Sequence, residues 1–189
     1  MERCEWVDQD PLMIKYHDQE WGTPTHDDRV LFELLILEGM QAGLSWKTIL
    51  NKRENFRKAF DNFDYEKIAL YNDQKVEDLL QDKGIIRNRL KIQSMIINAK
   101  EFIKIREEFG SFDKFIWNFV NGKPVNNSFE QLSQIPANSS LSDTISKALK
   151  KRGFKFIGTT IIYSYLQGIG IVNDHLTYCF RYNEIIKNY

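Results

Sequence analysis

Apolar residues recur at helical spacing along most of the chain, and the densest run lies at residues 30–37. Positions i, i+3, i+4 and i+7 share one face of a helix, so Glu38 continues the face that carries Leu31, Leu34 and Leu35. Glu33 falls on the opposite side, toward solvent. The pattern predicts a buried helix whose last turn carries a carboxylate on its core-facing stripe. A carboxylate there costs free energy unless it is paired or used.

Residues that commonly begin or end helices divide the remaining chain into further helical segments. The expected N-caps are Asp27 or Asp28, Ser45, Asp64, Asn72, Ser111 and Ser142, and the expected C-terminal stops are Gly84, Gly110 and Gly153. Residues 1–26 and 121–141 are expected to be irregular. The β-branched run 157–162 is typical of a strand, but no alternating partner occurs elsewhere, so a helix beginning near Gly158 is expected. The predicted fold class is all-α.

The composition limits the classes of protein. With 189 residues, of which 42% are hydrophobic and 13% aromatic, the chain can bury one domain or two closely fused lobes. A formal net charge of zero argues against indiscriminate nucleic-acid binding, which usually needs an excess of basic residues. No apolar run is long enough to span a membrane, and the polar N-terminus does not predict a secretory signal. Two distant cysteines suit a reducing compartment, so a cytoplasmic protein is expected.

The first candidate site lies at the end of the buried helix. Gly43 marks a turn after Glu38, and Trp46 follows eight residues after the acid. An acid and a large ring that both point inward beside a flexible turn suit a small pocket. The structural alternative is that Glu38 pairs with a basic residue or lies at a frayed helix end, with Trp46 in the core. These residues alone favour that alternative.

The second candidate site joins the two ends of the chain. His175 and Cys179 are four residues apart, so a helical turn would present both on one face. Cys4 and His17, in the aromatic N-terminal arm, complete a Cys2His2 set of the kind that binds structural zinc. The alternative is that the cysteines are buried without a metal, which is the commoner role of cysteine.

The third candidate site is the hairpin from residue 149 to 160. A helix, a turn with Gly153 and Gly158, and a second helix would direct backbone N–H groups outward, where they can bind a DNA phosphate. The basic side chains beside it would strengthen this binding, and they are Lys147, Lys150, Lys151, Arg152 and Lys155. An ordinary helix pair with a solvated basic face explains the same spacing equally well.

Several long motifs give the chain a family resemblance. They are MERC at residue 1, YHDQEWG at 16–22, EGMQAGLSW at 38–46, GIIRNRLKI at 84–92, WNFVNGKP at 117–124, SKALKKRGFKFIGTTI at 146–161 and VNDH at 172–175. In these motifs the chain resembles bacterial 3-methyladenine DNA glycosylase I. The resemblance implies one all-α glycosylase domain over residues 1–189, made of two closely packed helical lobes. It also implies a helix-hairpin-helix at about 143–168.

The resemblance also implies roles for particular residues. It assigns structural Zn²⁺ to Cys4, His17, His175 and Cys179. It assigns recognition of the methylated base to Glu38 and stacking to Trp46, within a pocket walled by Tyr16 and by the further candidates Trp6, Trp21 and Met13. The turn with Gly43 and Leu44 would probe the gap left by the flipped nucleotide. The hairpin would bind DNA through Lys150, Lys151, Arg152, Gly153, Lys155 and Gly158.

The chain departs from the pattern of the family and its superfamily at several positions. Met13 stands where the family has tyrosine, and Phe156 replaces the first glycine of the hairpin. Asn173 and Thr160 occupy the places of the aspartate and lysine found in other helix-hairpin-helix glycosylases. Asp174 either points elsewhere or bonds to His175. A monofunctional glycosylase restricted to a labile cationic base is therefore expected.

The resemblance sets the expected partners. They are double-stranded DNA with an alkylated base and free 3-methyladenine as product, and the protein is expected to be a monomer. Two other classes remain open from the residues themselves. One is a lesion-binding module without turnover, and the other is a zinc-tethered interaction protein. Release of free base from methylated DNA separates the enzyme from both.

Overall fold

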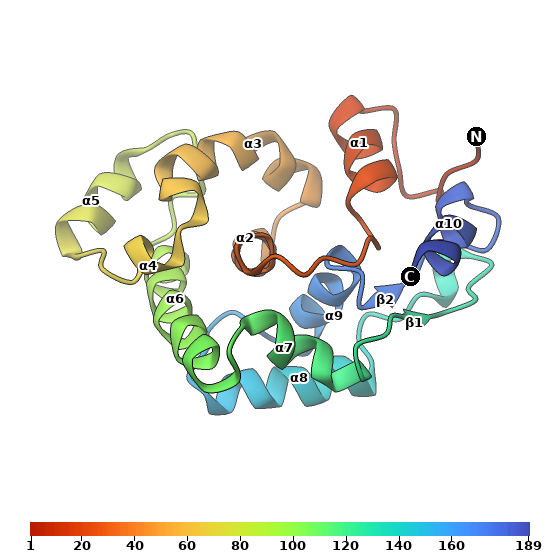
Figure 1. Ribbon diagram of the computed structural model, residues 1–189. Coiled ribbons are helices and arrows are strands. Elements are labelled where there is room, and N and C mark those ends of the chain that lie inside the picture. Colours follow the sequence, from red (N-terminus) through yellow and green to blue (C-terminus); the bar gives the residue numbers. More distant parts are fainter.

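The computed structural model describes residues 1–189 as an assembly of helices joined by short loops (Figure 1). The α-helices are α1 (Pro11–Gln19), α2 (Asp28–Gln41), α3 (Trp46–Ala59), α4 (Tyr65–Ile68), α5 (Asp73–Gln81), α6 (Arg89–Phe109), α7 (Phe112–Trp117), α8 (Ser140–Lys151), α9 (Thr159–Gly168) and α10 (Phe180–Asn188). Short 3-10 turns lie at Asp61–Phe63, Asn118–Val120 and Leu132–Gln134. The strands β1 (Val125–Asn126) and β2 (Val172–Asn173) form one parallel pair. The predicted all-α class is therefore confirmed apart from this two-residue pairing.

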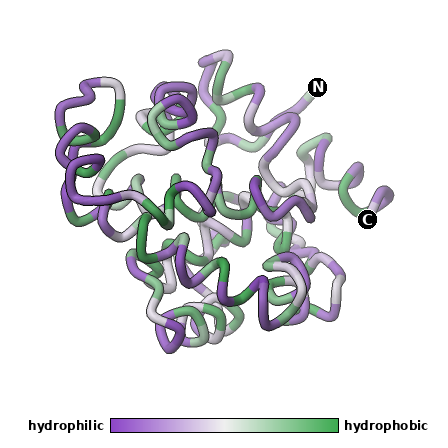
Figure 2. The backbone as a smooth tube through the Cα atoms, turned by 60° about the vertical axis from the view of Figure 1, so that its left-hand side comes forward, coloured by the Kyte–Doolittle hydropathy of each residue, from purple (hydrophilic) through white to green (hydrophobic).

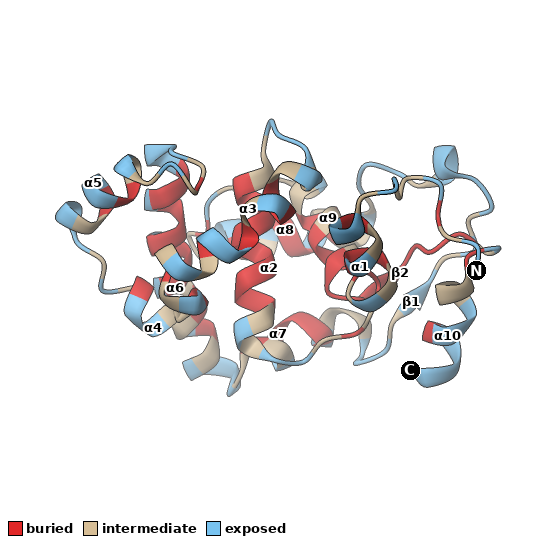
Figure 3. Ribbon diagram, turned by 90° about the horizontal axis from the view of Figure 1, so that it is seen from above, coloured by how far each residue is buried: buried red, intermediate tan, exposed pale blue.

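Helix α2 lies at the centre of the molecule. It packs against α3, α6, α7 and α9, which surround it in Figure 1, where it is seen end-on. Its residues from Leu31 to Met40 are all buried, and Figure 3 shows this as a continuous red helix. The Asp27 carboxylate caps its N-terminus by accepting from the backbone N–H groups of Arg29 and Val30. The core around α2 therefore fixes the positions of the side chains from Leu31 to Met40.

A smaller apolar cluster lies where the two ends of the chain meet. It contains Cys4, Met13, Tyr16, Trp21, Leu50, Leu176 and Cys179. The backbone N–H of Phe180 donates to the carbonyl of Glu2 at 3.0 Å, so α10 lies against the N-terminal arm. Hydrophobic and hydrophilic residues alternate within single helices in Figure 2, as expected when each helix has one buried face. None of the helices is both long and apolar enough to cross a membrane.

Most of the expected helix boundaries are confirmed. The N-caps Asp27, Ser45, Asp64, Asn72 and Ser111 each accept a hydrogen bond from the first turn, Gly110 and Gly153 end helices with a left-handed φ, and Gly158 begins α9. Two expectations are wrong. Helix α8 begins two residues before Ser142, because Ser139 and Ser142 form a reciprocal capping box. Helix α5 ends at Gln81, before Gly84 is reached.

The N-terminal arm is not irregular throughout, as the sequence had suggested. Helix α1 forms within it because the Asp10 carboxylate accepts from the Leu12 N–H and Pro11 occupies the first helical position. The solvent-facing prediction for Glu33 is also wrong. Helix α3 crosses α2 on that side, and the buried Glu33 carboxylate accepts from Arg53 at 2.6 Å and pairs with Arg57 at 2.9 Å.

Candidate functional site

The carboxyl group of Glu38 is buried without a partner. The side chain belongs to the last turn of α2, is only 4% exposed, and has no hydrogen bond to another protein group. Burial raises the pKa of this carboxyl to about 8, because the charged form loses its hydration. The alternative that Glu38 pairs with a basic residue is therefore wrong. A buried acid without a partner in the protein is free to bind a ligand that enters the cavity.

Glu38 opens into a cavity of about 260 Å³ with mainly aromatic walls. The lining residues are Trp6, Tyr16, Trp21, Glu38, Gln41, Trp46, Leu132, Ile135, Ser164 and Gln167. The Trp46 and Tyr16 ring centroids are 5.2 Å apart, and those of Trp6 and Trp21 are 4.9 Å apart. The indole N–H groups of Trp6 and Trp46 are buried without an acceptor. Flat apolar walls with unused donors suit a planar heteroaromatic ligand.

Tyr16 and Glu38 converge on the same side of the cavity. A methyl group built on Gly168 would lie 3.3 Å from the Tyr16 hydroxyl and 4.0 Å from the Glu38 Oε1. Burial, and then the nearby charge of Glu38, raise the pKa of Tyr16 well above its usual value, so the hydroxyl remains a donor. Met13 does not line the cavity. It packs in the apolar cluster behind Tyr16, which corrects its assignment to the pocket wall.

A second hollow of about 280 Å³ adjoins the aromatic cavity. Its walls are Ala42, Gly43 and Leu44 after α2, Thr160 and Ile161 at the start of α9, and three residues shared with the aromatic cavity, namely Glu38, Gln41 and Ser164. Gly43 has a φ of +78°, a conformation that suits glycine. Leu44 follows it and is 41% exposed. An apolar side chain thus projects from a tight turn beside the cavity mouth.

The expected hairpin is formed by α8, a turn and α9. Phe156 has a φ of +52°, so it adopts the left-handed conformation that a glycine would adopt more easily. Gly158 begins α9 without a side-chain cap, which leaves the N–H groups of the first helical turn free for an anion. The segment between α8 and α9 is thus a tight turn, and α9 begins without a side-chain cap; its use as a DNA-binding hairpin stays a prediction.

The basic residues of the hairpin differ in their surroundings. Lys150, Lys151 and Lys155 are exposed. Arg152 instead pairs with Glu108 at 2.6 and 3.0 Å, and its guanidinium lies over the rings of Phe109 and Phe115. Arg152 therefore differs from the three lysines, because its guanidinium is paired within the protein, and its contact with DNA stays a prediction.

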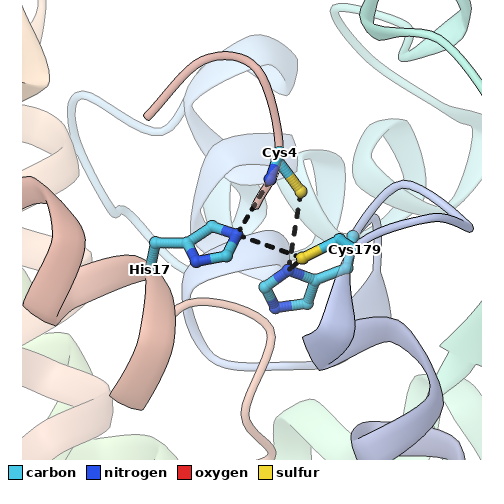
Figure 4. A group of neighbouring side chains, drawn as sticks. Cys4, His17 and Cys179 are labelled. Carbon is cyan, nitrogen blue, oxygen red and sulfur yellow. Dashed lines mark hydrogen bonds between the residues drawn. The ribbon is translucent and has the colours of Figure 1, made fainter. Parts of the chain in front are cut away.

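The four expected metal ligands form one buried cluster, which joins the N-terminal arm to the segment before α10 (Figure 4). The Cys179 Sγ lies 3.5 Å from the His17 Nε2, and the His175 Nδ1 lies 3.7 Å from both sulfurs. Bond lengths of about 2.1 and 2.3 Å in a tetrahedral zinc site imply roughly 3.6 Å between nitrogen and sulfur ligands. The cluster thus has the size of a metal site. The helical turn expected for residues 175–179 does not form, because Cys179 is the N-cap of α10.

The outer nitrogens of both imidazoles are already bonded. The His17 Nδ1 lies 2.8 Å from the Asp18 carboxylate, which also binds the Arg3 guanidinium at 2.8 and 2.7 Å. The His175 Nε2 lies 2.9 Å from the Trp21 carbonyl. When these outer nitrogens donate a proton, the His17 Nε2 and the His175 Nδ1 carry lone pairs that face the sulfurs, as metal binding requires. Asp174 does not bond to His175.

Protonation of the cluster also suits a cation. Hydrogen bonding between the two sulfurs raises the pKa of Cys4 and lowers that of Cys179, so the pair holds one proton near neutral pH. Burial lowers the pKa of His175, which keeps its imidazole neutral. A thiolate, a thiol that can lose its proton and neutral imidazoles are the ligand forms that bind zinc.

Comparison with known proteins gives the family. The family model described as "Methyladenine glycosylase" matches residues 6–182. The chain belongs to this family. Among the relatives of this methyladenine glycosylase is the DNA-3-methyladenine glycosylase 1 of Escherichia coli, which is 54% identical over 182 residues, or 96% of this chain and 97% of the relative. The DNA-3-methyladenine glycosylase of Haemophilus influenzae is 46% identical over 177 residues, or 94% and 96% of the two chains.

Solved structures agree with this assignment. A crystal structure of 3-methyladenine DNA glycosylase I that is 54% identical in sequence superimposes with a TM-score of 0.92, over 95% of this chain and 98% of the other. A structure of 3-methyladenine DNA glycosylase I from Staphylococcus aureus, described as the structural basis of 3-methyladenine recognition, is 38% identical with the same TM-score. It covers 95% and 96% of the two chains. The methyladenine glycosylase fold expected from the motifs is thus confirmed.

Sequence reasoning missed half of the cavity wall. The residues not found from the sequence are Gln41, Leu132, Ile135, Ser164 and Gln167. Ser164 and Gln167 are three residues apart on the mainly apolar α9, so they share a face, and this spacing was a usable signal. Leu132 and Ile135 come from the 121–141 loop, and nothing in their spacing indicates that the loop folds over the cavity.

Proposed function

We propose that this protein is a DNA repair glycosylase that removes 3-methyladenine from alkylated DNA by hydrolysis and leaves an abasic site. The observation that carries the proposal is the unpaired, buried carboxyl of Glu38 in a cavity walled by aromatic rings. Family membership and the names of the relatives support the same substrate. A base in duplex DNA must leave the stack before it can enter such a cavity.

The charge of the base explains its selection over adenine. Methylation of ring nitrogen 3 makes the nucleotide base cationic, and a cation favours ionisation of Glu38 by lowering its raised pKa. The base stacks against Trp46, with Tyr16 and Trp6 on the neighbouring walls, so that aromatic faces and one carboxylate surround it. Neutral adenine provides no charge to compensate the cost of ionising Glu38.

DNA is bound by the turn and the hairpin beside the cavity. Leu44 projects from the Gly43 turn and fills the space that the flipped nucleotide leaves in the duplex. The first-turn N–H groups of α9, after Gly158, bind a backbone phosphate, and the exposed Lys150, Lys151 and Lys155 add electrostatic attraction. The helix-hairpin-helix at about 143–168 is thus the proposed backbone grip.

The bond that breaks crosses the boundary between the two hollows. With the base in the aromatic cavity and the sugar in the adjoining hollow, the glycosidic bond passes Gln41 and Ser164, which line both. Water forms a bond to the sugar carbon, the bond from that carbon to the base breaks, and its electron pair neutralises the cationic base. The proton of the water passes to solvent. Asn173 is an amide and Thr160 has no amine, so neither activates a neutral base nor forms a Schiff base with the sugar.

The proposed metal is structural zinc held by Cys4, His17, His175 and Cys179. Four protein ligands leave no position for a catalytic water, so the ion stabilises the fold and takes no part in the reaction. Binding ties Cys4 and His17, on either side of Trp6, to the segment before α10. The metal thereby holds the N-terminal wall of the aromatic cavity in position.

Release of free base from methylated duplex DNA tests the function. The expected result is liberation of 3-methyladenine by the purified protein and a strong reduction in Glu38→Gln, which keeps the shape of the side chain but removes its charge. Glu107→Gln, at an exposed acid of α6 outside the cavity, is the control and is expected to retain activity. Binding of methylated DNA without any release of base would indicate a lesion-binding module instead. Absence of both would contradict any role in repair.

A further inference from the structure

Helix α6 carries two buried polar side chains that the proposed reaction does not use. Lys91 is 7% exposed and Asn98 is 4% exposed. They are seven residues apart, which is about two helical turns, so both lie on the face of α6 that packs toward α2. Burying a lysine and an asparagine is costly unless their hydrogen-bonding groups are satisfied, and here the partners are backbone atoms of two loops.

Lys91 binds the end of α2. Its ammonium donates to the carbonyl of Met40 at 2.8 Å and to that of Ala42 at 2.7 Å. The last carbonyls of a helix lack partners within the helix and carry its partial negative charge, so an ammonium suits this position. No carboxylate pairs with Lys91, and these backbone contacts account for its burial. Its effect is to fix the path of the chain into the Gly43–Leu44 turn.

Asn98 binds the turn of the hairpin in the same manner. Its amide oxygen accepts from the Lys155 N–H at 2.8 Å, and its amide nitrogen donates to the Lys155 carbonyl at 3.0 Å. One side chain thus satisfies both backbone groups of a residue in the turn between Gly153 and Gly158. The neighbouring Phe156 packs against Gly39 of α2, where a built methyl group would lie 3.5 Å from its Cβ.

The two anchored loops are the two that border DNA in the proposed function. The rise of an α-helix separates the two residues by about 10 Å along α6, and the helix backbone makes this separation rigid. Between the anchors only about 10 Å³ is free, in a cleft lined by α2, α6 and Phe156. The turn and the hairpin therefore cannot slide past one another without breaking buried hydrogen bonds.

We propose that Lys91 and Asn98 are positioning residues that hold the Leu44 turn and the hairpin turn at a fixed separation on α6. Because of this separation, binding of one phosphate by the hairpin brings Leu44 to the stack beside the damaged nucleotide. The inference rests on the proposed function, since it concerns how the same site engages DNA. Lys91 and Asn98 act before the base enters the cavity. The free base is recognised by Glu38 and the aromatic walls.

The test compares excision from DNA with binding of free base. Lys91→Met keeps the length of the side chain but removes the ammonium, and Asn98→Leu keeps the volume but removes both hydrogen bonds. In each variant, single-turnover release of 3-methyladenine from duplex DNA is expected to fall at least tenfold, while affinity for free 3-methyladenine changes less than twofold. Asn98→Leu is also expected to reduce the dependence of DNA affinity on salt, because a phosphate contact is lost. Lys91→Met is expected to leave that dependence unchanged.

Matched controls separate positioning from general loss of structure. Lys100→Met changes an exposed lysine of the same helix and is expected to behave as the unaltered protein. Asn98→Asp retains the acceptor for the Lys155 N–H, so it is expected to be more active than Asn98→Leu and less active than the unaltered protein. The double variant is expected to be little worse than the poorer single variant, because release of either loop removes the fixed separation.

Two results would overturn the inference. One is excision within twofold of the unaltered protein in both variants. The other is an equal loss of free-base affinity and excision, which would indicate a disturbed cavity. If the unaltered protein releases no base from methylated DNA, the proposed function fails. If the unaltered protein and both variants all release base at similar rates, only the positioning role of Lys91 and Asn98 fails.

Discussion

The carboxyl of Glu38 is expected to make the stability of the fold depend on pH. Burial raises its pKa from 4.5 to about 8, so the folded protein keeps a proton that the unfolded chain releases. Below pH 4.5 both the folded and the unfolded chain keep the proton, and the contribution of this group to the free energy of unfolding is at its maximum. As the pH rises from 4.5 toward 8, only the unfolded chain releases the proton, so this contribution is lost. From pH 5 to pH 7 the unfolded chain gains roughly 2–3 kcal/mol relative to the folded protein from this one group.

Glu38→Gln removes the titrating group and retains the shape of the side chain. The free energy of unfolding of the unaltered protein is therefore expected to fall by roughly 2–3 kcal/mol relative to that of the variant between pH 5 and pH 7. Urea unfolding of both proteins at half-unit pH steps measures the difference. All other titrating groups are common to the two proteins, so their contributions cancel in the comparison.

A bound cationic ligand should oppose the loss of stability at high pH. A cationic base analogue that binds beside Glu38 is expected to stabilise the unaltered protein more at pH 8 than at pH 5, because it pairs with the ionised carboxylate. The variant should lack this dependence. A difference in unfolding free energy that stays constant within about 0.5 kcal/mol from pH 5 to pH 7 would refute the assignment of a buried, uncompensated acid.

Three further outcomes are expected. Asp18→Asn removes the carboxylate that orients His17, so affinity for zinc should fall about 10- to 100-fold in a chelator competition, and an unchanged affinity would separate Asp18 from the metal site. Trp46→Ala should weaken binding of free 3-methyladenine by roughly 1–3 kcal/mol in a calorimetric titration, whereas Leu44→Ala should not. Borohydride should trap no protein–DNA adduct, because Thr160 has no amine, and efficient removal of neutral 1,N6-ethenoadenine would contradict the restriction to cationic bases.

Local patterns predicted the helices and most of their ends. Caps such as Ser45 and Ser111 depend on hydrogen bonds within one turn, so the residues alone carry the information. Helix α1 was missed although Asp10 and Pro11 are a recognisable start, because the aromatic residues of the arm have no clear periodicity. The solvent-facing prediction for Glu33 failed because periodicity reports one packed face, while α2 is surrounded on several sides.

The candidate site was less accessible to sequence reasoning. The convergence of Cys4 and His17 with His175 and Cys179 depends on contacts across more than 160 residues. The residue types suggested a Cys2His2 set, but the choice between a metal site and buried free cysteines came from the resemblance to a family. Arg152 pairs with Glu108 of another helix, and its place in a basic run gave no sign of this partner. Lys91 and Asn98 look like ordinary polar residues of a long helix. Their roles follow from which loops pack against α6, and no pattern in the chain encodes this.

The joining of distant segments at the metal cluster also has a consequence for synthesis of the protein. Cys4 emerges from the ribosome 171 residues before His175, and His17 emerges 162 residues before Cys179. At about 5–20 residues per second, the delay is on the order of ten to thirty seconds. Throughout that time the arm that carries Trp6 is without its partners and is available to chaperones. Chains that terminate before residue 175 therefore lack two of the four ligands of the metal cluster.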